Sequence, residues 1–171
     1  MVAHGVQKVH RKCMKREATP LDDADLRLLR AVQRDAAVAQ AELAEAAGVS
    51  ASLVSRRLTR LKEAGVLRAV VGLVDPARVG LTCAAIIRVR LKDHAAASVR
   101  AFRDLVARMP EATFCVMMTG EADYLLKIVA RDLPHFQEIV QSKLLRCAAI
   151  AHMESSIVLE HLKDTTELPL T

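Results

Sequence analysis

The hydrophobic periodicity of this 171-residue chain changes at about residue 80. Before that point, apolar side chains recur at helical spacing and the helical segments end at glycines. After it, alternating apolar runs typical of strands are interleaved with two helical segments. Because a helix and a strand bury their apolar faces in different ways, this change predicts two domains.

The segment after Pro20 predicts a first helix. Asp22 is a good N-cap residue, and Asp25 stands at the capping-box position three residues later. Apolar side chains then mark one face of this helix: Leu26, Leu29 and Val32. A second helix, in QAELAEAA, ends at Gly48, because glycine adopts the left-handed conformation of a helix end at little cost.

A third helix follows, with Ser50 as a candidate cap and with one buried stripe: Val54, Leu58 and Leu61. The opposite face is polar, with short side chains at its start and basic ones further along. A short helix, a glycine turn and a polar-faced helix are typical of a helix-turn-helix, whose second helix enters the major groove. The predicted DNA-binding residues are Ser50, Ser52, Ser55, Arg56, Arg57, Thr59 and Arg60. The alternative is a three-helix bundle with a solvated basic face.

Net charge is compatible with DNA binding and equally with a soluble tail beside one solvated helix face. The formal charge is +5, and all of this excess lies in residues 1–80, because residues 81–171 hold equal numbers of basic and acidic side chains. Much of it falls in the N-terminal stretch KVHRKCMKRE. A basic half beside a neutral half suggests a polyanionic partner on one side only, which is double-stranded DNA if the helix-turn-helix prediction holds.

The stretch VLRAVVGLVD, after Gly65, predicts a strand that is either a wing or a linker. Beyond it, strands are expected within 81–92, 112–118, 123–130 and 149–162, and helices within 95–109 and 133–145. The order β-α-β-β-α-β is that of a ferredoxin-like sandwich, an α+β fold with both helices on one face of the sheet. Since the strands are largely apolar on both faces, we expect the open face to be covered by a second copy of the chain.

Several function classes are disfavoured. Aromatic residues make up only 2%, which disfavours binding of single strands by base stacking. The four cysteines have no C-x-x-C spacing and the six histidines are scattered, so we expect no metal site, no cofactor and no catalytic residues, and an enzyme on a ferredoxin-like fold is disfavoured. Cys83 and Cys115 are interpreted as small buried hydrophobes. Neither a membrane span nor a signal peptide is predicted, and the expected location is the cytoplasm.

Four stretches carry a resemblance to a known family: LDDADLRLLRAVQRDA, LAEAAGVSASLVSRRLTRLKEAGVL, VDPARVGL and GEADYLLKIV. In order and spacing they resemble the leucine-responsive/AsnC (feast/famine) transcriptional regulators, from about Leu21 to the end. The resemblance implies a DNA-binding domain joined by a strand to a domain that senses amino acids. It also implies pairing through the C-terminal sheets, further assembly such as octamers, and an amino acid bound between subunits near the loop from Gly120 to Tyr124. Glu121 and Ala122 depart from the residues that many relatives carry.

The chemistry of this loop suits an amino acid. Gly120 permits a tight turn, so that amides around Thr119 and Glu121 can donate to a carboxylate, while Asp123 can accept from an ammonium group. Tyr124 has an apolar ring with one polar tip, which suits a pocket wall. The predicted effector-binding residues are Thr119, Gly120, Glu121, Asp123 and Tyr124. The alternative is that the glycine only makes the turn and the aspartate only caps the hairpin.

The predicted organisation is a basic arm at 1–20, a helix-turn-helix domain at 21–68, a linker at 69–80, an effector-binding and dimerisation domain at 81–162 and a tail at 163–171. The predicted function is sequence-specific transcriptional regulation in which assembly or DNA affinity responds to an amino acid. The alternative is an architectural DNA-binding protein that oligomerises and has no small-molecule effector.

Overall fold

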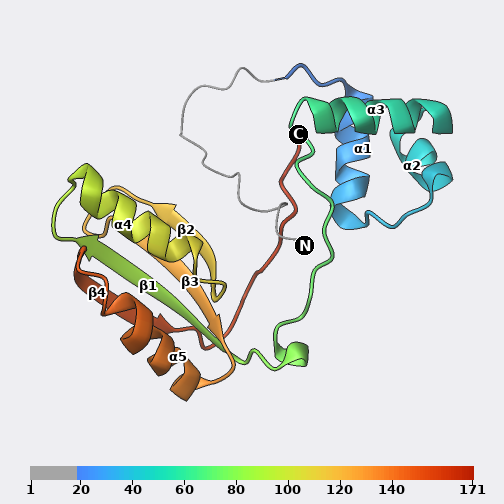
Figure 1. The fold of residues 1–171 in the computed structure, drawn as a ribbon. Coiled ribbons are helices and arrows are strands. Elements are labelled where there is room, and N and C mark those ends of the chain that lie inside the picture. Colours follow the sequence, from blue (N-terminus) through green and yellow to red (C-terminus); the bar gives the residue numbers. More distant parts are fainter. Residues whose placement is uncertain (1–18) are drawn as a thin grey trace. The chain divides into compact units, whose positions relative to one another are not determined.

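The computed structural model describes residues 19–171, so the predicted basic arm lies almost wholly outside the described residues. The chain forms two compact units. Within the described residues, one unit comprises 19–73 together with the C-terminal residues 163–171, and the other comprises 74–162 (Figure 1). The α+β fold class agrees with the sequence prediction.

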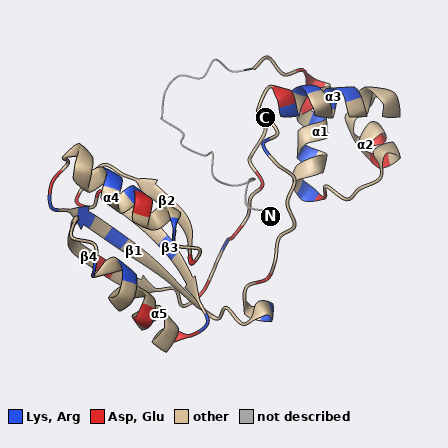
Figure 2. Ribbon diagram, in the orientation of Figure 1, with Lys and Arg blue, Asp and Glu red and all other residues tan. Residues whose placement is uncertain are grey.

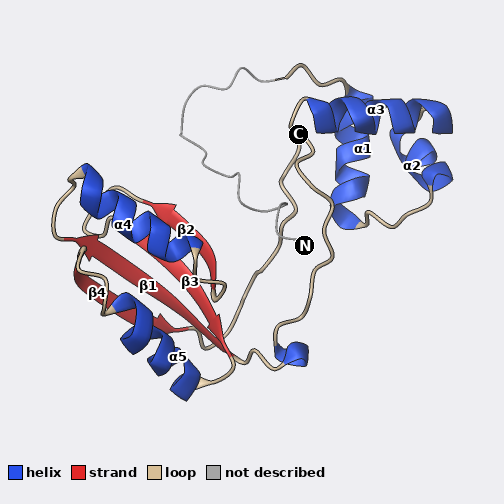
Figure 3. Ribbon diagram, viewed as in Figure 1, coloured by secondary structure: helices blue, strands red, loops and turns tan. Residues whose placement is uncertain are grey.

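The N-terminal unit contains three helices: α1 (Asp23–Arg34), α2 (Gln40–Ala47) and α3 (Ala51–Glu63) (Figure 3). The predicted capping box is present, because the Asp25 N–H donates to Asp22 Oδ1 at 2.8 Å and the Asp22 N–H donates to Asp25 Oδ2 at 3.2 Å. Helix α2 ends at Gly48 with φ of +68°, a left-handed conformation that favours glycine. Arg27 of α1 donates two hydrogen bonds to the carbonyl of Ala47, which joins α1 to the end of α2.

The core of this unit is entirely aliphatic. The predicted α3 stripe is confirmed, with Val54 and Leu61 fully buried and Leu58 packed beside them. The predicted α1 stripe is partly wrong, because Leu26 is only half-buried whereas Leu28 is fully buried. Leu28 is included in a cluster drawn from all three helices, so packing against both α2 and α3 shifts the buried face of α1 toward it.

The strand predicted after Gly65 is not observed. Residues 68–75 belong to no strand, so the described chain contains neither a wing strand nor a linker strand there. Four apolar side chains in this stretch are more than half exposed: Val70, Val71, Leu73 and Val74. A strand needs a neighbouring edge for its hydrogen bonds, and within residues 19–171 no edge pairs with this stretch. A 3₁₀ turn, η1 (Ala77–Val79), follows before the second unit begins its sheet.

The second unit confirms the ferredoxin-like order. Its elements are β1 (Cys83–Leu91), α4 (Ala96–Ala107), β2 (Ala112–Met117), β3 (Tyr124–Ala130), α5 (Leu133–Ile139) with a π-helical turn η2 (Val140–Leu144), and β4 (Ile150–Ile157). The strands are antiparallel in the order β2-β3-β1-β4, and both α4 and α5 cover the same face of the sheet (Figure 1). Strand β4 is shorter than predicted, because β1 begins at Cys83 and the last bond to it is donated by Val158 N–H to the Ala84 carbonyl.

The two faces of the sheet differ. Alternate residues of β1 and β3 are buried under the helices, with Phe102 of α4 and Ile139 of α5 packed on them. Cys83 is also buried on this face, as predicted, whereas Cys115 is only half-buried. The open face carries Ala84, Ile86, Leu125 and Val129, but the same register also places charged residues there: Arg88, Arg90, Lys127 and Glu154. The expectation of a largely apolar open face therefore holds for the start of β1 and, apart from Lys127, for β3, but is wrong beside β4. No helix among the described residues is both long and apolar enough to cross a membrane.

Candidate DNA-binding helix and effector loop

Helix α3 presents a solvated polar face. Ser52, Ser55, Arg56 and Thr59 are all exposed, at spacings of three and four residues that place them on one side of the helix. Basic residues lie along α3 (Figure 2). Short hydroxyls can donate to or accept from base edges, and an arginine can read guanine through two parallel hydrogen bonds. This face has the composition that readout in a major groove requires.

Two of the predicted arginines have partners inside the protein. Arg57 Nη1 lies 2.7 Å from Asp22 Oδ2 and 2.8 Å from Asp25 Oδ1, and Arg60 Nη2 forms a close ion pair with Asp25 Oδ2. The Asp25 side chain is 1% exposed and that of Arg57 is 22% exposed. These bonds join the start of α1 to the middle of α3, so Arg57 and Arg60 set the position of α3.

The ionisation states of the partners stabilise the contact between Asp25 and the two arginines. Burial raises the pKa of Asp25, but hydrogen bonds from Arg60, Arg57 and the Asp22 backbone outweigh it and lower the pKa to about 2. The Asp22 pKa is also lowered, first by the Asp25 backbone N–H and then by Arg57. The Arg57 pKa is raised by hydrogen bonds to the same two carboxylates. All three groups are therefore ionised at neutral pH.

The serines of the predicted site have different surroundings. Ser50 stands at the N-cap position of α3, but its side chain makes no capping bond; its Oγ lies 3.1 Å from Ser52 Oγ. Ser55 Oγ accepts from Gln40 Nε2 at 2.7 Å, which links the first residue of α2 to α3. Arg56 lines a shallow hollow of about 380 Å³ together with Asp22, Arg57 and Arg60. Of the predicted residues, Ser52, Arg56 and Thr59 are exposed and have no bond to another helix within the described chain.

The loop between β2 and β3 is fixed at its base. Met118 N–H donates to the Asp123 carbonyl at 2.8 Å, and Asp123 N–H donates to the Val89 carbonyl at 2.9 Å. Asp123 Oδ2 accepts from Leu91 N–H at 2.8 Å, so the carboxylate also joins the hairpin to the end of β1. Its other oxygen, Oδ1, lies 3.7 Å from His94 Nε2. The carboxylate thus has one oxygen committed to the backbone and one facing a histidine.

The tip of this loop is open. Thr119, Gly120 and Glu121 are exposed, and within residues 19–171 their backbone N–H groups have no acceptor. Gly120 has φ of +115°, which a β-branched residue resists strongly. Within the described residues, three consecutive N–H donors thus lack acceptors, and Asp123 follows Glu121 by two residues.

Tyr124 belongs to the core. It is 6% exposed, and its ring centroid lies 4.5 Å from that of Phe102 at an angle of 42°. Burial raises the pKa of its hydroxyl. The structure thus places Thr119, Gly120, Glu121 and Asp123 together and Tyr124 beneath them. Sequence reasoning missed the Leu91 amide, at the end of β1, and His94, three residues beyond it, since neither is near Asp123 in sequence.

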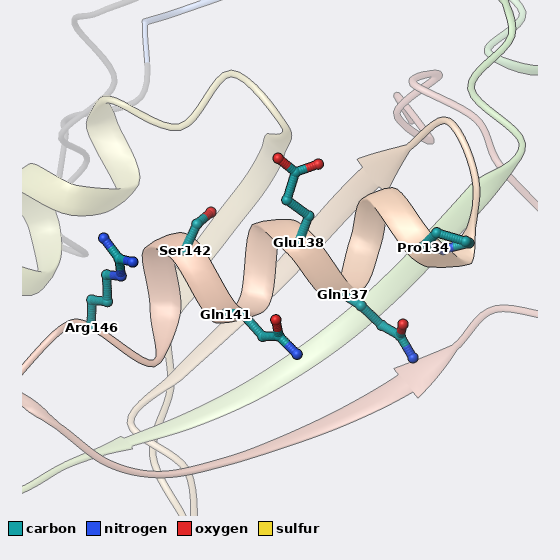
Figure 4. Close-up of a pocket in the computed structure, with 6 residues that line it drawn as sticks. All are labelled: Pro134, Gln137, Glu138, Gln141, Ser142 and Arg146. Atoms are coloured by element: carbon teal, nitrogen blue, oxygen red, sulfur yellow. The ribbon is translucent and has the colours of Figure 1, made fainter.

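A shallow hollow of about 320 Å³ runs along α5 and η2 (Figure 4). All of its lining residues are at least partly exposed: Pro134, Gln137, Glu138, Gln141, Ser142 and Arg146. A solvated surface of this kind neither shifts the pKa of a catalytic group nor encloses a ligand. In the part of the chain that the structure describes, no three His, Cys, Asp or Glu side chains are grouped so as to hold a metal ion.

Both units match known family models. Residues 21–68 match the model described as winged helix-turn-helix DNA-binding, and residues 84–168 match the Lrp/AsnC ligand binding domain. The chain is 33% identical to the HTH-type transcriptional regulator AldR of Mycolicibacterium smegmatis, over 88% of each protein. It is 32% identical to the leucine-responsive regulatory protein of Rhizobium meliloti, over 88% of this chain and 96% of that one.

A solved structure extends the likeness to three dimensions. A transcriptional regulator of Neisseria meningitidis, in complex with L-Met, is similar with a TM-score of 0.84 and 35% sequence identity, over 88% of this chain and 97% of that chain. The family models, the relatives and the fold agree on a DNA-binding transcriptional regulator with a ligand-binding domain. This chain belongs to the leucine-responsive/AsnC family.

Proposed function

We propose that the protein regulates transcription by binding a specific operator, and that an amino acid bound between subunits alters its assembly or its DNA affinity. The observation that carries DNA reading is the exposed face of α3, held in place by Arg57 and Arg60 through Asp25. In this proposal Ser52, Ser55, Arg56 and Thr59 contact base edges, while Ser50, at the start of the helix, contacts the DNA backbone. Arg57 and Arg60 orient the helix, and the carboxylates of Asp22 and Asp25 balance their charges.

Three unpartnered amides beside Asp123 support an amino-acid effector. The amides of 119–121 would hold a carboxylate and Asp123 would hold an ammonium group. The L-Met complex of the Neisseria relative supports the same ligand class. The protein then has no catalytic role, requires no cofactor, and acts in the cytoplasm where its operator is accessible.

Replacing Arg56 by alanine tests DNA reading. If Arg56 makes a bidentate base contact, operator affinity falls by about 1–3 kcal/mol, while binding to random DNA weakens less. Lys62→Ala is the matched control, because Lys62 is exposed on the same helix and carries the same charge. The measurement is a titration of both variants on operator and on random DNA at one salt concentration. Equal losses on both DNAs would make Arg56 a phosphate contact.

Assembly gives a second test. We propose that the open face of the sheet pairs with a second copy and that dimers assemble further, as in an octamer. Ile86 lies on this face, opposite Lys127 on one side and Ser156 on the other. In sedimentation at micromolar concentration, the parent should be a dimer or larger. Ile86→Asp should be a monomer, because a charge would be buried in the interface. A monomeric parent would contradict this assembly.

A further inference from the structure

The last nine residues pack on the DNA-binding helices, although they follow the effector unit in sequence. Residues 163–171 lie in the same compact unit as α1, α2 and α3 (Figure 1). Three side chains of α1 hold them. Arg30 Nε donates to the Leu170 carbonyl at 3.0 Å, and Arg34 Nε lies 3.0 Å from Glu167 Oε1. The third side chain is Gln33, which makes two bonds to the tail.

Gln33 binds the backbone of a single tail residue. Its amide nitrogen donates to the Leu168 carbonyl at 3.3 Å, and its amide oxygen accepts from the Leu168 N–H at 2.7 Å. The amide therefore satisfies both polar groups of one residue, as a neighbouring β-strand would. Arg30, Gln33 and Arg34 are spaced by three and four residues, so they form one face of α1.

Apolar packing fixes which tail residue points inward. The Leu170 side chain packs against the aliphatic core of the three helices, whereas Leu168 is 64% exposed. The Leu170 N–H donates to the Leu168 carbonyl at 2.9 Å, which closes a three-residue turn around Pro169. This turn presents the Leu168 backbone to Gln33 and the Leu170 side chain to the core. The face of α1 thus fits one occupant, the C-terminal segment of this chain.

Docking of the tail gives the DNA-binding unit a second connection to the effector unit, which is noncovalent where the tail meets α1. Strand β4 ends at Ile157 and Glu167 is bonded to α1, so at most residues 158–166 bridge the gap. Nine residues span at most about 30 Å, and residues 68–75, which precede the hydrogen-bonded turn at 76–81, span a similar distance of at most about 28 Å. With the tail docked, two connections of similar length, in place of one, limit how far the DNA-binding helices can move.

We propose that residues 163–171 form a strap that docks on α1 and fixes the spacing between half-sites that an assembled pair of chains can bind. This inference rests on the proposed binding of two half-sites. Two DNA-binding units on single flexible linkers would tolerate many spacings, because effective concentration varies slowly with distance on a loose tether. A second tether narrows that range. The exposed face of α3 is untouched, so affinity for a single half-site is independent of the strap.

The test compares two variants of the full-length protein. Leu170→Asp places a carboxylate against the aliphatic core and should undock the tail without changing any residue of the three helices. Leu168→Asp is the matched control, because it adds the same charge two residues away on an exposed side chain and leaves the backbone bonds to Gln33 in place. Two readouts are needed: amide hydrogen exchange at Leu168, and affinity for operators whose half-sites are moved apart by half a helical turn, about 5 base pairs.

In the parent and in Leu168→Asp, the amide of residue 168 should be protected, and the altered spacing should cost about tenfold or more in affinity. In Leu170→Asp, the amide of residue 168 should lose its protection from exchange. The altered half-site spacing should then reduce operator affinity by about threefold or less. An unprotected amide at residue 168 in the parent would overturn docking. A protected amide with identical spacing profiles in all three proteins would overturn the role in spacing. If the parent does not prefer operator over random DNA, the proposed function is overturned. Hydrogen exchange at residue 168 then still tests whether the tail docks.

Discussion

Asp25→Ala should destabilise the N-terminal unit by about 2–4 kcal/mol, because it removes one partner from a buried ion pair. The Asp25 side chain is 1% exposed and accepts hydrogen bonds from Arg57, Arg60 and the Asp22 backbone. Without it, Arg57 keeps only Asp22, and its buried Nε already lacks a partner in the described chain. The start of α1 would also lose half of its capping box. Operator affinity should fall with stability, since α3 loses the bonds that position it.

The measurement is urea unfolding followed by helical circular dichroism, because the N-terminal unit contains no aromatic residue. Asp23→Ala is the matched control. Asp23 is an exposed carboxylate in the same first turn of α1, and its removal should change stability by about 0.5 kcal/mol or less. A loss for Asp25→Ala no larger than that of the control would mean that the ion pair contributes nothing net.

The ion pairs of Asp25 also predict that the stability of the folded protein depends on pH. A carboxyl group whose pKa is lowered in the folded state contributes stability above its unfolded pKa, and this contribution is lost as pH falls toward the folded pKa. Folding lowers the pKa of the Asp25 carboxyl from its ordinary value of 3.8 to about 2. The parent should therefore lose about 2 kcal/mol from this group as pH falls from about 4 to 2. Asp25→Asn should lack this part of the dependence, and the difference between parent and variant isolates it from other carboxylates.

Asp123→Asn should weaken effector binding by about 1.5–3 kcal/mol, which is tenfold or more in affinity. The asparagine retains an oxygen that can accept from Leu91 N–H, so the hairpin keeps its bond to β1, but the charge that would face an ammonium group is gone. Asp123→Ala removes both interactions and should cost more, on the order of 2–5 kcal/mol. Operator affinity of the ligand-free protein should barely change, because the loop and α3 belong to different units.

Glu121→Gln is the matched control for this prediction. It removes the same charge two residues away, on an exposed side chain, and leaves the amides of 119–121 in place. The experiment is calorimetric titration with a panel of amino acids, followed by DNA titration with and without the ligand found. If Asp123→Asn responds to the effector as the parent does, Asp123 only supports the hairpin. If no amino acid binds the parent, the result supports the alternative, an architectural DNA-binding protein without a small-molecule effector.

Local sequence patterns were sufficient to predict much of this fold. The capping box at Asp22 and Asp25 and the left-handed Gly48 depend only on residues within one helical turn, and both are present as predicted. The order of strands and helices after residue 80 was also predictable, because alternation and helical spacing are local patterns. So was the position of the loop that holds Gly120 and Asp123. The predicted strand after Gly65 failed because a strand requires a partner edge, which its own sequence does not supply.

Contacts between distant residues were decided by tertiary structure alone. Arg56 and Arg57 are adjacent basic residues on the same helix, yet Arg56 is exposed while Arg57 pairs with Asp25, 32 residues away. Spacing along the chain could not distinguish them, because the packing angle between α1 and α3 determines which side chain reaches the carboxylate. The docking of Leu168 on Gln33 joins residues 135 apart and had no sequence signal at all. Apart from the strand expected after Gly65, sequence determined which elements form, whereas the packing of those elements determined which polar groups are left for DNA and which hold the protein together.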